Sequence, residues 1–165
     1  MDAGACGIIF PNVKNANQIN FSIKKCLWPK FGSRGLGFSR SNLYGIHISK
    51  YIKQYERPII IAMIESLEGV ENLDSILKNK FIDSIFIGPY DLSMSMGIPG
   101  QFETKKFKSE IKKILNTCKK YQVSMGMHVT RPDKKLLKKY IKNGFNFIAY
   151  GADIIFLTNN SANPL

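Results

Sequence analysis

Apolar residues along this chain gather in two alternating kinds of segment. Five short runs are continuously apolar instead of alternating in polarity, which is typical of strands buried on both faces of a parallel sheet. They cover residues 6–10, 58–64, 84–87, 123–129 and 145–150. Amphipathic stretches lie between them, and this alternation predicts a parallel sheet covered by helices.

The amphipathic stretches are clearest in the second half of the chain. One stripe at helical spacing consists of Phe107, Ile111, Ile114, Leu115 and Cys118. A second stripe consists of Leu136, Leu137, Tyr140 and Ile141, followed by Gly144 where a helix C-cap is expected. Further helices are predicted around Ile23 and Leu27, over residues 43–55 and over residues 70–77.

A parallel sheet covered by helices leaves two architectures, an open doubly wound sheet or a (β/α)8 barrel. Residues 1–4 read like the last turn of a helix with Gly4 as its cap, and five predicted strands are fewer than a barrel needs. No repeat, low-complexity tract or evident linker interrupts the chain. We therefore expect one domain over residues 1–165 that is incomplete at its N-terminus.

The composition is that of an ordinary globular domain. With 165 residues and 44% hydrophobic content, the chain is long enough for one core. No apolar run approaches the ~18 residues of a membrane span, and the first residues lack the features of a secretory signal. Cys6, Cys26 and Cys118 form no C-x-x-C pair, which favours a reducing compartment. These features predict a cytoplasmic protein without a membrane partner.

The chain carries a formal net charge of +12, from 24 basic and 12 acidic residues. Such an excess can indicate an RNA-binding protein, whose binding would depend strongly on salt. Many lysines, however, fall in pairs that alternate with apolar residues at helical spacing, as on solvated helix faces. No RNA-binding motif accompanies them. We therefore expect no nucleic-acid partner, and a lysine-rich surface that steers anionic substrates.

Two carboxylates stand where predicted strands end. Glu65 follows the apolar run 58–64, and Asp91 lies in the turn after the run 84–87. One strand–helix unit separates them, so a parallel sheet places them on neighbouring strands about 4.8 Å apart, at the edge where sites of such folds are built. As alternatives, Glu65 could complement a helix dipole, and Asp91 could be an ordinary turn residue.

Two carboxylates so close repel each other unless a proton or a cation lies between them. A hard divalent ion such as Mg²⁺ or Mn²⁺ suits the pair, because it takes a couple of carboxylates and leaves positions for substrate oxygens. Such an ion could chelate a 2-oxo acid and stabilise the enolate formed when a carbon–carbon bond breaks. The turn at Gly88 and Pro89 could offer the amides of Tyr90 and Asp91 to a substrate carboxylate, or be a tight turn without a ligand.

Residues 86–93 (FIGPYDLS), followed by residues 95–100, resemble the signature loop of the HpcH/HpaI aldolase family, which includes 2-dehydro-3-deoxyglucarate-type and 2,4-dihydroxyhept-2-ene-1,7-dioate-type aldolases. Residues 64–66 with residues 69–73 resemble its other metal-site motif, and segments 2–11, 34–37 and 44–45 resemble its central segments. The resemblance implies the C-terminal two-thirds of a (β/α)8 TIM barrel of the phosphoenolpyruvate/pyruvate type. It also implies that Glu65 and Asp91 bind Mg²⁺ or Mn²⁺, with Co²⁺ as a further candidate. The Gly88–Tyr90 turn, including Pro89, would hold the pyruvate carboxylate.

The chain departs from that family at several positions. The family's first three strand–helix units supply a general-base histidine and a substrate arginine, and this chain begins after them. Neither His47 nor His128 occupies the place of that histidine. His128, near the end of a predicted strand, could still face the pocket, but a structural role is favoured for it. Met63 stands where many members have a glutamine. The tail 153–165 is short and polar where the family has a closing helix. Arg34 could bind an anion or brace its loop, and the brace is favoured.

These features favour a divalent-metal-dependent class II aldolase that reversibly cleaves a 2-oxo-3-deoxy acid to pyruvate and an aldehyde. The resemblance implies a homo-oligomer that acts on small molecules. The catalytic residues themselves are not identified in this chain. The alternative is a catalytically silent fragment of such an aldolase that retains a metal site or acts in assembly.

Overall fold

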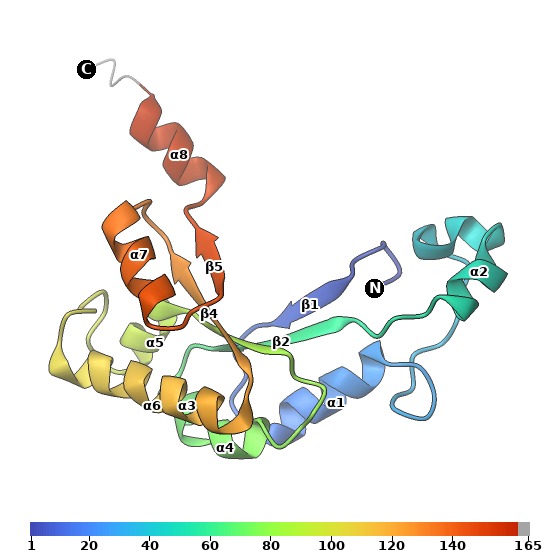
Figure 1. Ribbon diagram of the computed structural model, residues 1–165, viewed down its shortest axis with the longest axis horizontal. Helices are drawn as coiled ribbons and strands as arrows, with labels where there is room; N and C mark the ends of the chain where they lie inside the picture. The colour runs from blue at the N-terminus through green and yellow to red at the C-terminus, as the bar shows by residue number, and fades with distance from the viewer. Residues whose placement is uncertain (162–165) are drawn as a thin grey trace.

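The computed structural model describes residues 1–161, whose five strands form one parallel sheet that curls into a half-barrel (Figure 1). The strands are β1 (Gly7–Phe10), β2 (Ile59–Ile64), β3 (Ser84–Ile87), β4 (Ser124–Val129) and β5 (Phe147–Tyr150). Their order in the sheet is the order in the chain, and every neighbouring pair is parallel. The five predicted strands and their parallel arrangement are therefore confirmed.

Helices follow the strands, and several of them cover the outer face of the sheet (Figure 1). They are α1 (Ala16–Cys26), a 3-10 helix (Arg40–Gly45), α2 (Ile48–Lys53), α3 (Leu67–Glu71), α4 (Leu73–Ile76), α5 (Pro89–Ser95), α6 (Lys105–Tyr121), α7 (Lys134–Lys142) and α8 (Asp153–Asn160). Both helical stripes in the second half of the chain belong to helices of the structure, α6 and α7. Within residues 1–161, no helix is long and apolar enough to cross a bilayer.

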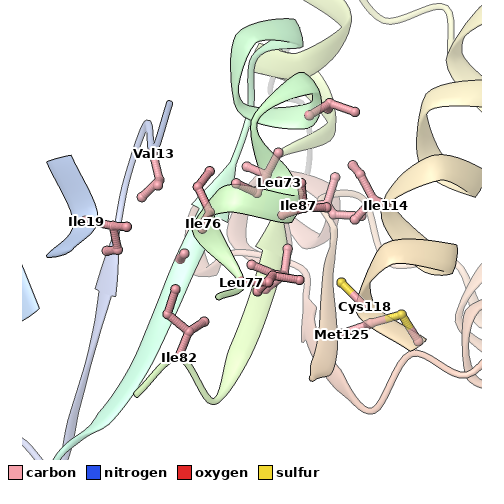
Figure 2. Packing of buried hydrophobic residues seen from close by; sticks show 14 of the residues in the cluster. Val13, Ile19, Leu73, Ile76, Leu77, Ile82, Ile87, Ile114, Cys118 and Met125 are labelled. Carbon is pink, nitrogen blue, oxygen red and sulfur yellow. The ribbon is translucent and has the colours of Figure 1, made fainter. Parts of the chain in front are cut away.

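The core lies between the sheet and these helices (Figure 2). Alternate side chains of the central strands, including Ile60, Ile64, Ile85 and Ile87, point to this side and are fully buried. From the helices, Ile19, Ile23, Leu73, Ile76, Ile114 and Cys118 pack into the same cluster. Because a strand turns successive side chains to opposite faces, the residues between them line the concave inner face.

The inner face is covered unevenly. Four residues lie in register across β2 to β5: Met63, Phe86, Gly126 and Phe147. The ring centroids of Phe86 and Phe147 are 5.5 Å apart. Every residue of β3 is buried, but Ile9 of β1 and Phe147 of β5 are 39% and 38% exposed. Burial on both faces, predicted for all five strands, is therefore correct for the central strand and wrong for β1 and β5, which form the edges of the sheet.

Two helix predictions are wrong in detail. The helix expected over residues 43–55 is broken, because Leu43 and Tyr44 adopt left-handed φ values of 49° and 54°. The buried Asn42 side chain holds this break, since it accepts the amides of Ser39 and Gly45. The helix expected over residues 70–77 is divided as well, because Asn72 separates α3 from α4. The tail, which reads as short and polar, contains helix α8, which extends away from the sheet (Figure 1).

Candidate active site at the carboxyl ends of the strands

Glu65 is held at the end of β2 by a contact with the loop that follows β1. The backbone N–H of Asn12 donates to Glu65 Oε1 at 2.6 Å. The next residue, Ser66, caps α3 by accepting the N–H of Gly69 at 3.2 Å, so the chain turns into a helix directly after the carboxylate. The side chain of Glu65 is therefore positioned by two neighbouring strand ends. It lies half-buried at the carboxyl-terminal edge of the sheet.

Gly88, directly after β3, has no side chain, and the side chain of Glu65 occupies the space beside it. A Cβ at this position would lie 2.8 Å from Glu65 Oε2 and 3.1 Å from Glu65 Cβ. Its φ of −90° is open to any residue, so close approach, and not backbone freedom, requires glycine here. The two strand ends that carry the candidate site are thus in direct contact.

Asp91 lies in the first turn of α5, where the sequence had predicted only a turn. Pro89 takes the first helical position, which suits its fixed φ and missing N–H, and Gly88 is the N-cap. The first-turn amides of Tyr90 and Asp91 therefore lack acceptors within the helix. Asp91 itself is exposed and reaches the same side of the sheet as Glu65.

These side chains line one cavity of about 230 Å³, which we call the carboxylate hollow. Its walls are Met63, Glu65, Phe86, Gly88, Pro89, Tyr90, Asp91, His128 and Thr130. All five residues singled out in the sequence as metal or substrate contacts are among them. The structure thus brings together, from two separate segments, the residues that the sequence had marked individually.

The electrostatics of the hollow reflect two neighbouring acids. Burial raises the pKa of Glu65, the N–H of Asn12 lowers it, and the negative charge of Asp91 raises it further, so the net shift is upward. Nowhere in residues 1–161 do three or more His, Cys, Asp or Glu side chains gather as a metal site. A pair of carboxylates nevertheless fits Mg²⁺ or Mn²⁺, which bind through one or two carboxylates and fill the remaining positions with water and substrate oxygens.

Thr130 was not recognised as a site residue in the sequence, and for His128 a structural role was favoured over a place in the pocket. His128 projects from β4 onto the inner face, lines the hollow, and has its Nε2 3.3 Å from the carbonyl oxygen of Gly151. His128 lies near the carboxyl end of β4 and Thr130 directly follows that strand. This position was the signal in the sequence that could have marked both as site residues. Arg34 stays outside the site: it bonds Asp2 at 2.6 Å and Tyr51 at 3.4 Å, as expected for a brace.

Comparison with known proteins shows the family of this chain. The model of the HpcH/HpaI aldolase/citrate lyase family matches residues 1–160. The chain belongs to this family. A family protein from Burkholderia cenocepacia has the same fold, with a TM-score of 0.88 at 24% identity over 96% of this chain and 63% of that one.

The curated relatives of this family member are aldolases. A 2-keto-3-deoxy-L-rhamnonate aldolase of Salmonella paratyphi A is 31% identical, in an alignment that covers 100% of this chain and 62% of that protein. A 5-keto-4-deoxy-D-glucarate aldolase of Escherichia coli is 28% identical, over 93% of this chain and 60% of that protein. The chain therefore spans less than two-thirds of the length of these relatives.

Proposed function

We propose that this chain provides the metal and pyruvate site of a divalent-metal-dependent aldolase, which reversibly cleaves a 2-oxo-3-deoxy acid to pyruvate and an aldehyde. One observation carries the proposal: Glu65, directly after β2, and Asp91, in the helix after the adjacent strand β3, line one hollow together with the Gly88–Tyr90 segment. The aldolase activity of the relatives supports it. The proposed enzyme is a cytoplasmic homo-oligomer with a (β/α)8 barrel, to which this half-barrel, as a domain of residues 1–165, contributes five strands.

Each residue of the hollow has a defined part in this proposal. Glu65 and Asp91 hold Mg²⁺ or Mn²⁺, or alternatively Co²⁺. When bound, this ion supplies Lewis-acid stabilisation of the negative charge that develops on the 2-oxo oxygen of the substrate. The amide of Asn12 keeps the Glu65 carboxylate in place, and Gly88 leaves space beside it.

The substrate carboxylate is assigned to the segment from Gly88 to Tyr90. The amides at the start of α5 lack helical acceptors and point outward along the helix axis, which favours an anion. The ring of Tyr90 packs edge-on against Phe102, with centroids 5.0 Å apart, and forms a wall beside this position. These groups orient pyruvate, while the base that moves its methyl proton is not assigned to any residue here.

Thermal unfolding with Mn²⁺ and pyruvate tests the proposal. A ligand at about one hundred times its Kd stabilises the folded state by about 2.7 kcal/mol. For a chain of this size that raises the unfolding midpoint by roughly 5–10 °C. We expect the full rise only when both ligands are present. A cooperative transition that neither ligand moves would contradict the proposed site and support a silent fragment.

Gly88→Ala is expected to weaken Mn²⁺ binding by about tenfold, in the range typical of changes next to metal ligands. The added methyl group would lie 2.8 Å from Glu65 Oε2, so the carboxylate must turn away from the hollow. Titration with Mn²⁺, followed by calorimetry, measures the effect. Gly35→Ala is the control, because a Cβ there has no atom within 4 Å. Equal affinity of both variants would show that the position of Glu65 does not matter.

A further inference from the structure

A cavity of about 260 Å³ lies between α6 and α7, over the side of β4 that faces these helices, and we call it the interhelix cavity. Both helices and Met127 of β4 line it. The interhelix cavity shares no residue with the carboxylate hollow. A molecule bound in it therefore occupies a place separate from the proposed metal and pyruvate site.

The walls of the interhelix cavity are mainly apolar. They include Phe102, Phe107, Ile111, Leu115, Met127 and Phe145. The ring centroids of Phe102 and Phe107 are 5.3 Å apart, at the start of α6. The ring centroids of Tyr140 and Phe145 are also 5.3 Å apart, at the end of α7. A ligand that fills this space must have a hydrocarbon part, because burying apolar surface is what these walls can stabilise.

The charged groups around the interhelix cavity have a surplus of positive charge. They are Glu103, Lys108, Lys112 and Lys139. Lys108 Nζ lies 2.6 Å from Glu103 Oε2, and this contact lowers the pKa of the Glu103 carboxyl. Lys112 and Lys139 are exposed, and no ion pair between residues of the described range 1–161 involves either. Two ammonium groups, one from each helix, are thus available to an anion.

We propose that the interhelix cavity binds a medium-chain carboxylate, with the alkyl chain between α6 and α7 and the carboxylate at Lys112 and Lys139. The apolar walls match the chain, and the two unpaired ammonium groups match the charge of its head. The volume is slightly below the ~300–1,000 Å³ of sites for drug-sized ligands, so a single acyl chain suits it better than a molecule with several rings. This inference is independent of the proposed function, because it involves neither the metal nor pyruvate.

Hexanoate and octanoate test the apolar part of the site, in the absence of divalent ions. Each methylene group buried from water raises affinity about fourfold, so octanoate should bind roughly 15 times more tightly than hexanoate. Titration of the ¹⁵N-labelled chain, followed by NMR, measures both dissociation constants. It also locates the ligand, because the amides of Phe107, Ile111 and Leu115 should shift. Equal affinity of the two acids, or shifts confined to residues of the carboxylate hollow, would overturn the proposal.

Octanoate and 1-octanol test the charged part, because they have the same number of carbon atoms and differ in the head group. The unaltered chain should prefer octanoate by about fivefold, in the range expected of two exposed ion pairs. The double variant Lys112→Gln, Lys139→Gln should lose this preference and keep its affinity for 1-octanol.

The matched control is the double variant Lys119→Gln, Lys138→Gln. It removes the same charge from exposed positions of the same two helices, and neither lysine lines the interhelix cavity. Its preference for octanoate should be that of the unaltered chain. An intact preference in the Lys112 and Lys139 variant, or the same loss in the control, would overturn the assignment of the carboxylate to these two lysines.

Discussion

Glu65→Gln is expected to abolish the stabilisation by Mn²⁺ and pyruvate while the metal-free chain stays folded. Glutamine has the same shape as glutamate, and its carbonyl oxygen can still accept the N–H of Asn12 that now meets Oε1 at 2.6 Å. What disappears is the negative charge, which a divalent ion requires from one of only two acidic ligands. The whole rise of roughly 5–10 °C in the midpoint should be lost.

Glu68→Gln is the matched control for that experiment. Glu68 is exposed in the first turn of α3, three residues from Glu65, and its carboxylate lies 3.9 Å from Lys14 Nζ. Removing such a surface pair changes stability by about 1 kcal/mol or less. Its response to Mn²⁺ and pyruvate should be that of the unaltered chain. A full ligand response in Glu65→Gln would rule out Glu65 as a metal ligand.

The same variant gives a pH signature without metal. Burial, opposed by the Asn12 amide and assisted by Asp91, raises the pKa of Glu65 above the 4.5 of the unfolded chain. The folded state therefore binds the Glu65 proton more readily, and this contribution to stability is full below the unfolded pKa and lost as the pH rises through the folded pKa. At neutral pH the metal-free Glu65→Gln chain should be at least as stable as the unaltered one. This difference should vanish as the pH falls below 4.5.

Ile114→Ala is expected to lower the free energy of unfolding by about 3 kcal/mol, a large part of the roughly 5–15 kcal/mol that a domain has in total. Ile114 is fully buried in the middle of α6, on the side that faces the sheet (Figure 2). Truncation removes buried methyl groups and leaves a cavity, because the strands behind it cannot close the gap. Urea unfolding measures the loss as a lower midpoint with an unchanged slope.

Ile141→Ala separates burial from the chemistry of the substitution. Ile141 lies on α7 and is 57% exposed, so its truncation should change stability by less than about 0.5 kcal/mol. Similar losses in the two variants would mean that α6 does not pack on the sheet as described. The comparison thus tests the layer of helices that holds the strand ends in place.

The sequence by itself determined the strands, their parallel arrangement and the positions of the two acids. Continuous apolar runs marked β2 and β3, and an acid directly after the first run or in the turn after the second marked Glu65 and Asp91. The strands and the acids are local features, because each depends on the spacing of residues within one element. The order of the strands in the sheet follows from the strong preference of sequential parallel strands to lie next to each other. The apolar stripe of α6 could also be predicted from the sequence, because it depends only on residue spacing within one helix.

Tertiary structure alone decided how the site is assembled. The bond from Asn12 to Glu65 joins residues 53 positions apart, and the contact of Gly88 with Glu65 joins two strand ends. His128, for which the sequence favoured a structural role and left a place in the pocket open, lines the hollow because β4 follows β3 around the curl of the sheet. Long-range packing sets such contacts. Hydrophobic spacing carries information about the face on which a side chain lies, but not about which distant group that side chain meets.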